Sequence, residues 1–188
     1  GFGLDTSPDI TGRIKYSSDL WTGVLSGVVR PGLELEQDPA LGAASGGSET
    51  GWGVHGSFGL SVANSYLFVN GTYGEGIGRY LINGDANDLF VDTGTGRVTA
   101  PTMWSVVPGV DLQWNDQWKS VLVWGHTEFD DTFESGDIET IDTLHANLWW
   151  QPVDNARFGI EYIYGTVDFN DGTDGDANRV QFGAQYSF

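Results

Sequence analysis

The last eleven residues of the sequence are Asn178-Arg179-Val180-Gln181-Phe182-Gly183-Ala184-Gln185-Tyr186-Ser187-Phe188. From Arg179 onward, polar or small side chains alternate with apolar ones. Successive side chains of a β-strand point to opposite faces of a sheet. This stretch is therefore predicted to be a strand with one polar and one apolar face, and the apolar face ends on the aromatic side chain of Phe188.

The same alternation recurs along the chain and predicts nine strands. These cover residues 9–16, 20–30, 51–62, 66–76, 102–114, 118–128, 138–151, 156–168 and 178–188. Two kinds of connection alternate between them. The short turns are 17–19, 63–65, 115–117 and 152–155, and the long loops are 31–50, 77–101, 129–137 and 169–177. A further strand around 88–91, inside the second long loop, is an alternative count.

Composition limits the classes of function. The chain has 188 residues, which is enough for one domain, and its 28 Gly and 25 aromatic residues (8 Trp, 7 Tyr, 10 Phe) suit a β-rich fold. It has no Cys, so disulfides and Cys-based metal sites are excluded. The net charge of −18 makes nucleic acid an unsuitable partner, because phosphate binding needs a cationic surface. The sequence contains no run of 18 apolar residues, so no transmembrane helix is predicted.

Short turns at one end of the strands and long loops at the other resemble the layout of bacterial outer-membrane β-barrels, as does a terminal aromatic residue. The resemblance implies an all-β, antiparallel transmembrane β-barrel in the bacterial outer membrane, with lipid outside and water inside. Strands 9–16 and 178–188 are expected to run in the same direction, whereas bacterial barrels contain an even number of strands. We therefore expect residues 1–188 to be a single β-barrel segment, the C-terminal part of a larger barrel.

In the central strands, apolar residues occupy alternate positions and form one face, which is expected to contact lipid. Aromatic residues lie at both ends of its stripes, as they do in the interfacial girdles of membrane barrels. The alternative is that these side chains form the core of a soluble sheet. The apolar stripes are Trp104, Val106, Pro108, Val110, Leu112 and Trp114; Trp118, Ser120, Leu122 and Trp124; Leu144, Ala146, Leu148 and Trp150; and Phe158, Ile160, Tyr162 and Tyr164.

The opposite parity carries the charges expected to line a pore. Six of the eight bases lie inside strands on this polar face, whereas most of the 26 acids lie in or beside the long loops. A basic wall beneath an acidic rim would favour anions in a water-filled channel. The predicted pore-lining residues are Arg13, Lys15, Arg30, Asp111, Lys119, Arg157, Glu161 and Arg179.

Local pairing is an alternative role for these charges. Glu161 is expected to pair with Arg157 or Arg179, and Asp111 with Lys119, which would stabilise the wall without selecting a solute.

Residues 168–176 combine carboxylates and glycines as calcium loops do, with Asp171, Asp174 and Asp176 as weak candidate ligands. The spacing of a full EF-hand is absent, so no metal site is predicted. A solvated exterior loop that holds Ca²⁺ loosely and bridges to lipopolysaccharide phosphates is the favoured interpretation. No other cofactor is expected. His55, His126 and His145 show no spacing with a nucleophile and a third partner that predicts catalysis, so we do not expect an enzyme.

Segments of the chain resemble the DcaP-like trimeric porins of Gram-negative bacteria. Residues 8–13 and 71–79 are also similar to segments of that family, and the C-terminal motifs are Leu148-Trp149-Trp150-Gln151-Pro152, Arg157-Phe158-Gly159-Ile160-Glu161-Tyr162-Ile163-Tyr164-Gly165 and Asn178-Arg179-Val180-Gln181. The resemblance implies a sixteen-stranded barrel, a homotrimer and passage of small anionic, dicarboxylate-like solutes. The matched pore-wall positions are Arg13, Arg157, Glu161 and Arg179. The family's N-terminal strands have no counterpart in these 188 residues.

The expected function is passive diffusion of small hydrophilic, anionic solutes through a basic-lined lumen, with the lipid bilayer and lipopolysaccharide as surroundings. Two alternatives of other classes are an outer-membrane barrel that anchors or adheres through its acidic loops, and a secreted β-sandwich that binds glycans through exposed Trp.

Overall fold

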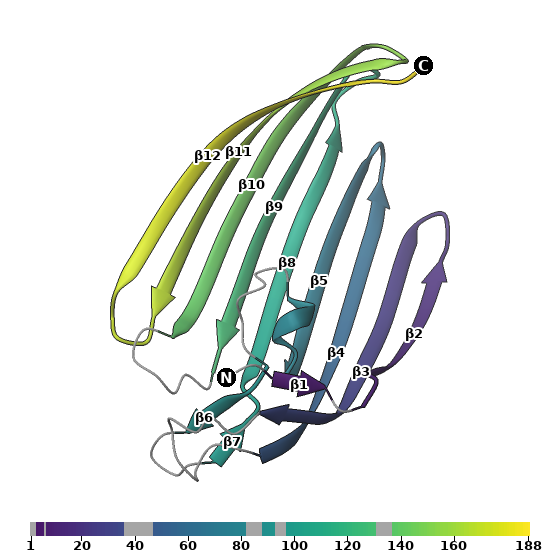
Figure 1. Cartoon of the computed structure of the whole chain (residues 1–188). Coiled ribbons are helices and arrows are strands. Elements are labelled where there is room, and N and C mark those ends of the chain that lie inside the picture. Colours follow the sequence, from purple (N-terminus) through teal and green to yellow (C-terminus); the bar gives the residue numbers. More distant parts are fainter. Residues whose placement is uncertain (1–2, 6, 36–46, 82–87, 93–96, 131–136) are drawn as a thin grey trace.

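The computed structural model describes residues 3–5, 7–35, 47–81, 88–92, 97–130 and 137–188. They form an all-β fold dominated by one curved antiparallel sheet (Figure 1). Its strand order is β1-β3-β4-β5-β8-β9-β10-β11-β12, and β2 pairs with β3 beside β1. The strands are β1 (Gly3–Asp5), β2 (Ile10–Ser17), β3 (Trp21–Leu35), β4 (Gly47–Val62), β5 (Ser65–Glu75), β8 (Thr102–Gln113), β9 (Trp118–Phe129), β10 (Ile138–Val153), β11 (Ala156–Phe169) and β12 (Asp174–Tyr186).

The nine predicted strands are confirmed as β2, β3, β4, β5, β8, β9, β10, β11 and β12. Their short turns lie at the end of the sheet where the C-terminus lies, and β1 lies toward the opposite end (Figure 1). In the described residues, no helix is long and apolar enough to cross a membrane.

The predicted bounds of two loops are wrong, because several strands continue past the end of the apolar alternation. β3 extends to Leu35 and β4 starts at Gly47, so pairing enters the predicted loop 31–50 from both sides. β12 starts at Asp174, so the predicted loop 169–177 is reduced to the turn between Phe169 and Asp174. Backbone hydrogen bonds between strands do not require an apolar face, so a pattern of side chains alone underestimates strand length.

The alternative strand around residues 88–91 is present only in part. β6 (Phe90–Asp92) pairs with β7 (Arg97–Thr99) in a separate two-stranded sheet and does not join the main one. The main sheet therefore passes directly from β5 to β8.

The convex face of the sheet carries the predicted apolar stripes. In the register of the sheet, Leu148 lies opposite Ile160, which lies opposite Phe182 on the next strand. These side chains are 39%, 42% and 81% exposed, although they are large and apolar. Near the short turns, the Trp150 ring packs 6.0 Å from Trp118 and 5.9 Å from Phe158. Nothing in the described part of the chain covers this face.

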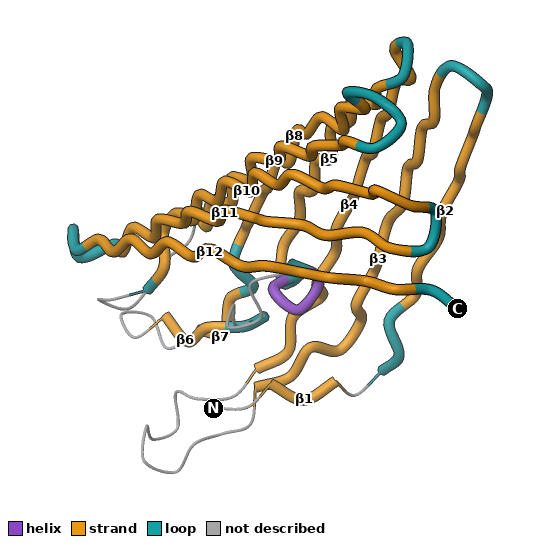
Figure 2. Tube along the Cα trace, turned by 90° about the horizontal axis from the view of Figure 1, so that it is seen from above, coloured by secondary structure: helices purple, strands orange, loops and turns teal. Residues whose placement is uncertain are grey.

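The buried core lies on the concave side instead. After β5 the chain turns inward at Gly76, whose φ is +63°, and forms the short 3-10 helix η2 (Gly78–Tyr80). We call residues 76–81 the inner segment. Viewed from above, η2 lies within the curve of the sheet (Figure 2). The buried side chains around it are Ile77, Met103 and Phe129, with Val28, Leu81, Ile138 and Ile141 packed against them.

Two glycines on the concave face let the inner segment approach the wall. A Cβ atom at Gly53 would lie 3.0 Å from Ile77 Cγ2, and one at Gly74 would lie 2.9 Å from Ile77 Cδ1. Glycine is suited to such close approach because it has no Cβ. The wall is therefore shaped so that Ile77, which is 1% exposed, packs directly on the backbone.

Substitution of Gly53 by Val is expected to displace Ile77 and lower the free energy of unfolding by about 1–3 kcal/mol, the usual cost of overpacking. The measurement is urea unfolding of the detergent-solubilised protein, followed by Trp fluorescence. Gly56→Val is the matched control on the same strand, because nothing lies within 4 Å of a Cβ at Gly56. Equal destabilisation by both variants would contradict the packing argument.

Candidate functional site: the concave face and the inner segment

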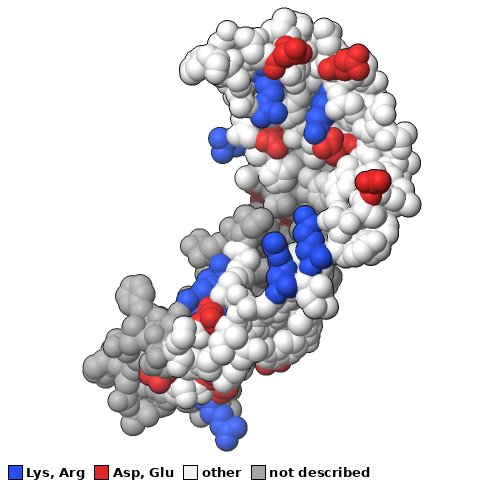
Figure 3. All heavy atoms as spheres, turned by 90° about the vertical axis from the view of Figure 1, so that its right-hand side faces the viewer, with Lys and Arg blue, Asp and Glu red and all other residues white. Residues whose placement is uncertain are grey.

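The register of the sheet places the predicted charged residues on its concave face. One row across β5, β8, β9, β10, β11 and β12 contains two of them, in the order Tyr66, Asp111, Val121, Asn147, Glu161 and Gln181. Figure 3 shows Lys and Arg side chains bordering the hollow of the curved sheet, with Asp and Glu beside them. The strand pairings thus place on one surface charges that are far apart in sequence.

One expected ion pair is present. Lys119 Nζ lies 2.7 Å from Asp111 Oδ2, and both side chains are partly exposed, at 43% and 29%. An exposed pair of this kind contributes about 0–1 kcal/mol to stability. Its main effect on the concave face is that the two charges cancel.

The expected pairing of Glu161 with Arg157 or Arg179 is wrong. Glu161 lies opposite Gln181, accepts a hydrogen bond from its amide, and lies 3.5 Å from His145 Nδ1. Each Arg faces another residue: Arg157 opposite Gln185 and Arg179 opposite Ile163. Parity identifies a shared face but does not give the register, and the register decides which side chains meet.

Arg157 is held by neutral groups. Its Nε donates to Gln185 Oε1 at 2.7 Å, and its guanidinium carbon lies 4.9 Å from the centre of the Trp149 ring. The guanidinium is thus oriented by a hydrogen bond and a cation–π contact while its charge is not neutralised.

Three other predicted cations are exposed on the concave face. Arg13 and Lys15 lie on β2, and Arg179 lies on β12. Within the described part of the chain, none of the three has an ion-pair partner. Their charges are available to a solute.

Arg30 is the exception among the predicted pore-lining bases. It lies on the concave side of β3, but its side chain is fully buried beneath the inner segment. Its Nε lies 3.2 Å from Asp9 Oδ2, its Nη1 lies 2.9 Å from Asp88 Oδ1, and Nη1 also donates to the carbonyl oxygen of Gly76. Sequence parity predicted the face correctly and could not show that a later loop covers it.

Two residues of the inner segment complete what we call the Arg30 cluster: Asp9, Arg30, Arg79, Tyr80 and Asp88. The Tyr80 hydroxyl donates to Asp9 Oδ2 at 2.5 Å, and Arg79 Nε lies 2.8 Å from Asp88 Oδ2. The cluster joins the residue before β2, strand β3 and two parts of the connection between β5 and β8, one at Arg79 and Tyr80 and the other at Asp88.

The pKa values of two cluster groups are shifted. Burial alone would raise the pKa of Asp9, but the hydrogen bond from Tyr80 and the charge of Arg30 outweigh it and hold that pKa below its ordinary value. The hydrogen bond to Asp9, together with burial, raises the pKa of Tyr80. The bonded state of this pair is therefore charged Asp9 with neutral Tyr80.

The three histidines occupy different surroundings. His55 Nδ1 lies 3.0 Å from Thr72 Oγ1 on the concave face, while the neighbouring Ser57 donates to Asn70 at 2.6 Å. His126 belongs to the convex parity instead, where its ring lies 4.9 Å from that of Trp104 and its Nδ1 lies 3.1 Å from Asp142 Oδ1.

The candidate calcium ligands do not share one loop. Asp171 accepts hydrogen bonds from Thr173 N at 3.0 Å and Thr173 Oγ1 at 2.5 Å, and these bonds lower the pKa of its carboxyl. Asp174 and Asp176 lie on β12, opposite Asp168 and Thr166. Among the described residues, no group of three or more His, Asp or Glu side chains is arranged to hold a metal ion.

Replacement of Arg30 by Met is expected to release the inner segment, because Asp9 and Asp88 would lose their shared countercharge. Removing one partner of a buried ion pair costs about 3–5 kcal/mol. Trypsin should then cleave after Arg79 at least tenfold faster than in the unmodified protein, as measured by mass spectrometry of timed digests.

Arg179→Met is the control for that experiment, because it removes an exposed base from the concave face without touching the cluster. Unchanged cleavage after Arg79 in the Arg30→Met protein would show that the cluster does not hold the inner segment.

Acid is expected to release the same segment. The stability contributed by Asp9 is present above its ordinary pKa of 3.8 and is lost as pH falls through its lowered value. The contribution of Tyr80 is present below pH 10.0 and is lost as pH rises through its raised pKa. Amide hydrogen exchange of residues 76–81, corrected for intrinsic rates, should stay slow near neutral pH and rise as the pH falls well below 3.8. In Asp9→Asn protein, the acid-dependent increase should be much smaller.

Comparison with family models and with curated proteins found no match. Among solved structures, the chain is similar to the crystal structure of the outer membrane channel DcaP of Acinetobacter baumannii, with a TM-score of 0.85 and 24% sequence identity. The match covers 99% of this chain and 53% of the other, so the chain spans about half the length of that channel. This likeness shows that residues 1–188 have the fold of a segment of a DcaP-like porin barrel.

Proposed function

We propose that this chain is the C-terminal part of a bacterial outer-membrane porin through which small, hydrophilic, anionic solutes diffuse passively. The observation that carries the proposal is the division of one curved sheet into an exposed apolar convex face and a charged concave face. The solved structure of similar fold is that of an outer membrane channel.

The convex face has the chemistry of a surface in contact with lipid. The strands of the main sheet from β3 to β12 contain 11–16 residues each, and about 9–11 tilted residues cross a bilayer. Trp118, Trp150 and Phe158 form an aromatic patch near the short turns, as expected where a barrel meets the membrane interface. We infer an outer-membrane location with the lipid bilayer and lipopolysaccharide as surroundings.

The two edges of the sheet support completion by further strands. Within the described residues, β2 and β12 each pair along one side only. An unpaired strand edge is not tolerated in hydrocarbon, because its backbone groups would lack hydrogen bonds. We therefore propose that additional strands close a sixteen-stranded barrel, which assembles as a homotrimer.

The anion preference rests on the balance of charge within the strands on the concave face. The Lys119–Asp111 pair cancels, and Glu161 remains as the carboxylate against four exposed cations. These cations are Arg13, Lys15, Arg157 and Arg179. A narrow passage bounded by low-dielectric walls amplifies such an excess.

The inner segment would determine the width of the passage. It lies within the curve of the sheet and is fixed there by the buried side chain of Ile77 and by the Arg30 cluster. A channel of this design needs no cofactor and no covalent chemistry, and we propose no enzymatic activity. Loose binding of Ca²⁺ to the acidic loops stays a prediction.

The other candidate functions find less support. A glycan-binding sandwich would need a second sheet packed on the apolar face, and the described residues provide none. An anchor or adhesion barrel would share this fold, but it would not need a net excess of cations on the concave face.

Planar-bilayer recording of the complete, detergent-extracted protein under a salt gradient tests the proposal. We expect stable conductance with a reversal potential that indicates anion preference. Replacing Arg157 and Arg179 together with Gln should lower the anion-to-cation permeability ratio by about threefold or more, because unit charges interact by about 1 kcal/mol across 4 Å of water.

Arg97→Gln is the control, because Arg97 lies on β7 away from the mid-strand charges. Cation preference in the unmodified protein would refute the proposed selectivity, and absence of conductance would favour an anchor.

A further inference from the structure

Beside the inner segment, the concave face contains a cavity of about 390 Å³ that extends over strands β4, β5, β8, β9 and β10. We call it the central hollow. Among the described residues that line it there is no Asp, Glu, Lys or Arg, although charged side chains lie on strands at both sides of it. The side chains used in the following argument are Thr72, Tyr80, Leu81, Ser105, Thr127 and Thr143.

Hydroxyl groups form a row along the wall of the central hollow. In the register of the sheet, Thr72 of β5 lies opposite Ser105 of β8, which lies opposite Thr127 of β9. Neighbouring strands are about 4.7–4.9 Å apart, so the row offers one hydroxyl at each such step. Thr143 of β10 adds another, because its Oγ1 lies over Gly125, 2.9 Å from the position that a Cβ would take there.

Three of these hydroxyls have no partner in the described part of the protein. Ser105, Thr127 and Thr143 make no side-chain hydrogen bond there, whereas Thr72 Oγ1 lies 3.0 Å from His55 Nδ1. No buried side-chain oxygen of the described residues lacks a partner, so these three hydroxyls are accessible from the hollow that they line. Each can donate one hydrogen bond and accept two.

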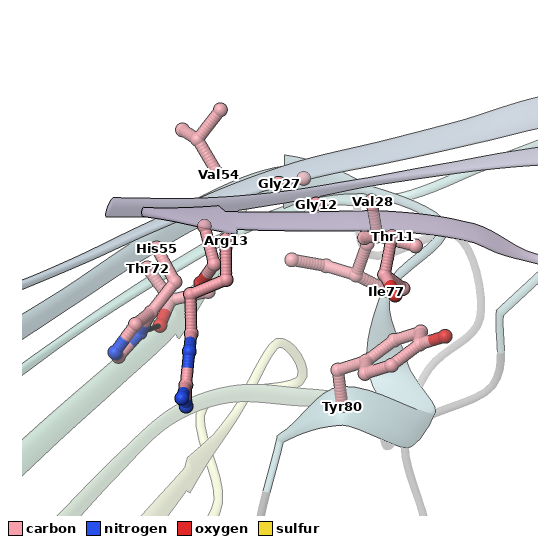
Figure 4. A pocket seen from close by; sticks show the side chains of 12 residues that line it. Thr11, Gly12, Arg13, Gly27, Val28, Val54, His55, Thr72, Ile77 and Tyr80 are labelled. Atoms are coloured by element: carbon pink, nitrogen blue, oxygen red, sulfur yellow. Dashed lines mark hydrogen bonds between the residues drawn. The ribbon is translucent and has the colours of Figure 1, made fainter. Parts of the chain in front are cut away.

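The inner segment adds apolar surface to the same space. Tyr80 and Leu81 line the hollow, and His55 and Thr72 project from the wall on the side where η2 carries Tyr80 (Figure 4). The Tyr80 hydroxyl is bonded to Asp9, so the ring is fixed in position and offers mainly its apolar surface. The central hollow therefore combines unpaired hydroxyls with apolar surface, the mixture typical of a site for a small molecule.

We infer that the central hollow binds small uncharged solutes that carry several hydroxyl groups, the class of polyols and monosaccharides. The hydroxyls of such a solute donate to and accept from Ser105, Thr127 and Thr143, and its C–H groups contact Tyr80 and Leu81. An apolar solute would leave the wall hydroxyls unpaired, and a charged solute would find no Lys, Arg, Asp or Glu in the lining. The inference goes beyond the anionic solutes of the proposed function, and only the passage of such solutes rests on that function.

Saturation-transfer difference NMR of the complete protein in detergent, with xylitol as the probe, tests the inference. We expect a saturable signal whose half-saturation concentration is lower, by about fivefold or more, than that of 1,5-pentanediol, which has the same carbon chain but hydroxyls only at its ends. Xylonate, in which a carboxylate replaces one terminal CH₂OH group, should bind no more tightly than xylitol.

A variant that combines Ser105→Ala, Thr127→Val and Thr143→Val should raise the half-saturation concentration of xylitol by about fivefold or more, because three hydrogen-bonding groups are lost with little change of shape. Thr166→Val is the matched control. It also removes a hydroxyl from a strand, but Thr166 lies on the convex face, opposite Asp142 and Asp176, and its loss should leave xylitol binding unchanged.

Several outcomes would overturn the inference: no saturable xylitol signal, equal half-saturation for xylitol and 1,5-pentanediol, tighter binding of xylonate, or equal effects of the triple variant and Thr166→Val. The comparison of the three probes on the unmodified protein decides the matter even where the triple variant fails to fold. Bilayer conductance of the same preparation separates the two proposals. Conductance without xylitol binding refutes the polyol site and leaves the porin, whereas xylitol binding without conductance refutes the porin and leaves a binding site.

Discussion

The burial of the Arg30 guanidinium between the sheet and the inner segment is the interaction on which the concave surface depends. A buried charge must be paired, and here Asp9 and Asp88 come from the two segments that have to be fixed in place. A buried ion pair adds little net free energy compared with apolar packing, but it tolerates few geometries. The packing of Ile77 on the backbone of the wall glycines supplies apolar stabilisation of the inner segment, and the Arg30 cluster determines where that segment lies. Together they create the groove between the inner segment and strands β2 to β5, which would not exist if the connection after β5 extended into solvent.

Most of the sheet could be predicted from the sequence, because an antiparallel strand with one polar and one apolar face repeats every two residues. The nine main strands and the apolar face follow from that period. The two-residue alternation could not predict the pairing register between strands or the burial of individual side chains. Glu161 shares a face with Arg157 and Arg179 yet meets Gln181, and Arg30 has the parity of a pore residue yet lies under η2. Both outcomes depend on residues distant in sequence, which a local pattern does not contain.

One signal in the sequence did mark the inner segment. Val28, Met103 and Ile141 are apolar residues at positions of polar parity, and Gly53 and Gly74 share that parity. On the concave face, apolar and glycine positions that cluster at the same end of several strands indicate that something packs there. The connection between β5 and β8, with Ile77 and Leu81, is the apolar segment within reach. Departures from the expected alternation thus carried as much information about the site as the alternation itself.

The net charge of −18 is compatible with a cationic concave face. Most acidic residues lie in or beside the long loops, whereas most basic residues lie within the strands. Unit charges in water are screened over roughly 8–10 Å at ordinary ionic strength, so carboxylates near the loops act weakly on a solute at mid-strand. Close contacts then decide which ion is stabilised, and within the strands these are with Arg13, Lys15, Arg157 and Arg179. Asp88 and Asp9 lie nearer to the passage, but both are bonded to Arg30. The cluster that positions the inner segment therefore also neutralises the carboxylates that would otherwise oppose an anion at the groove.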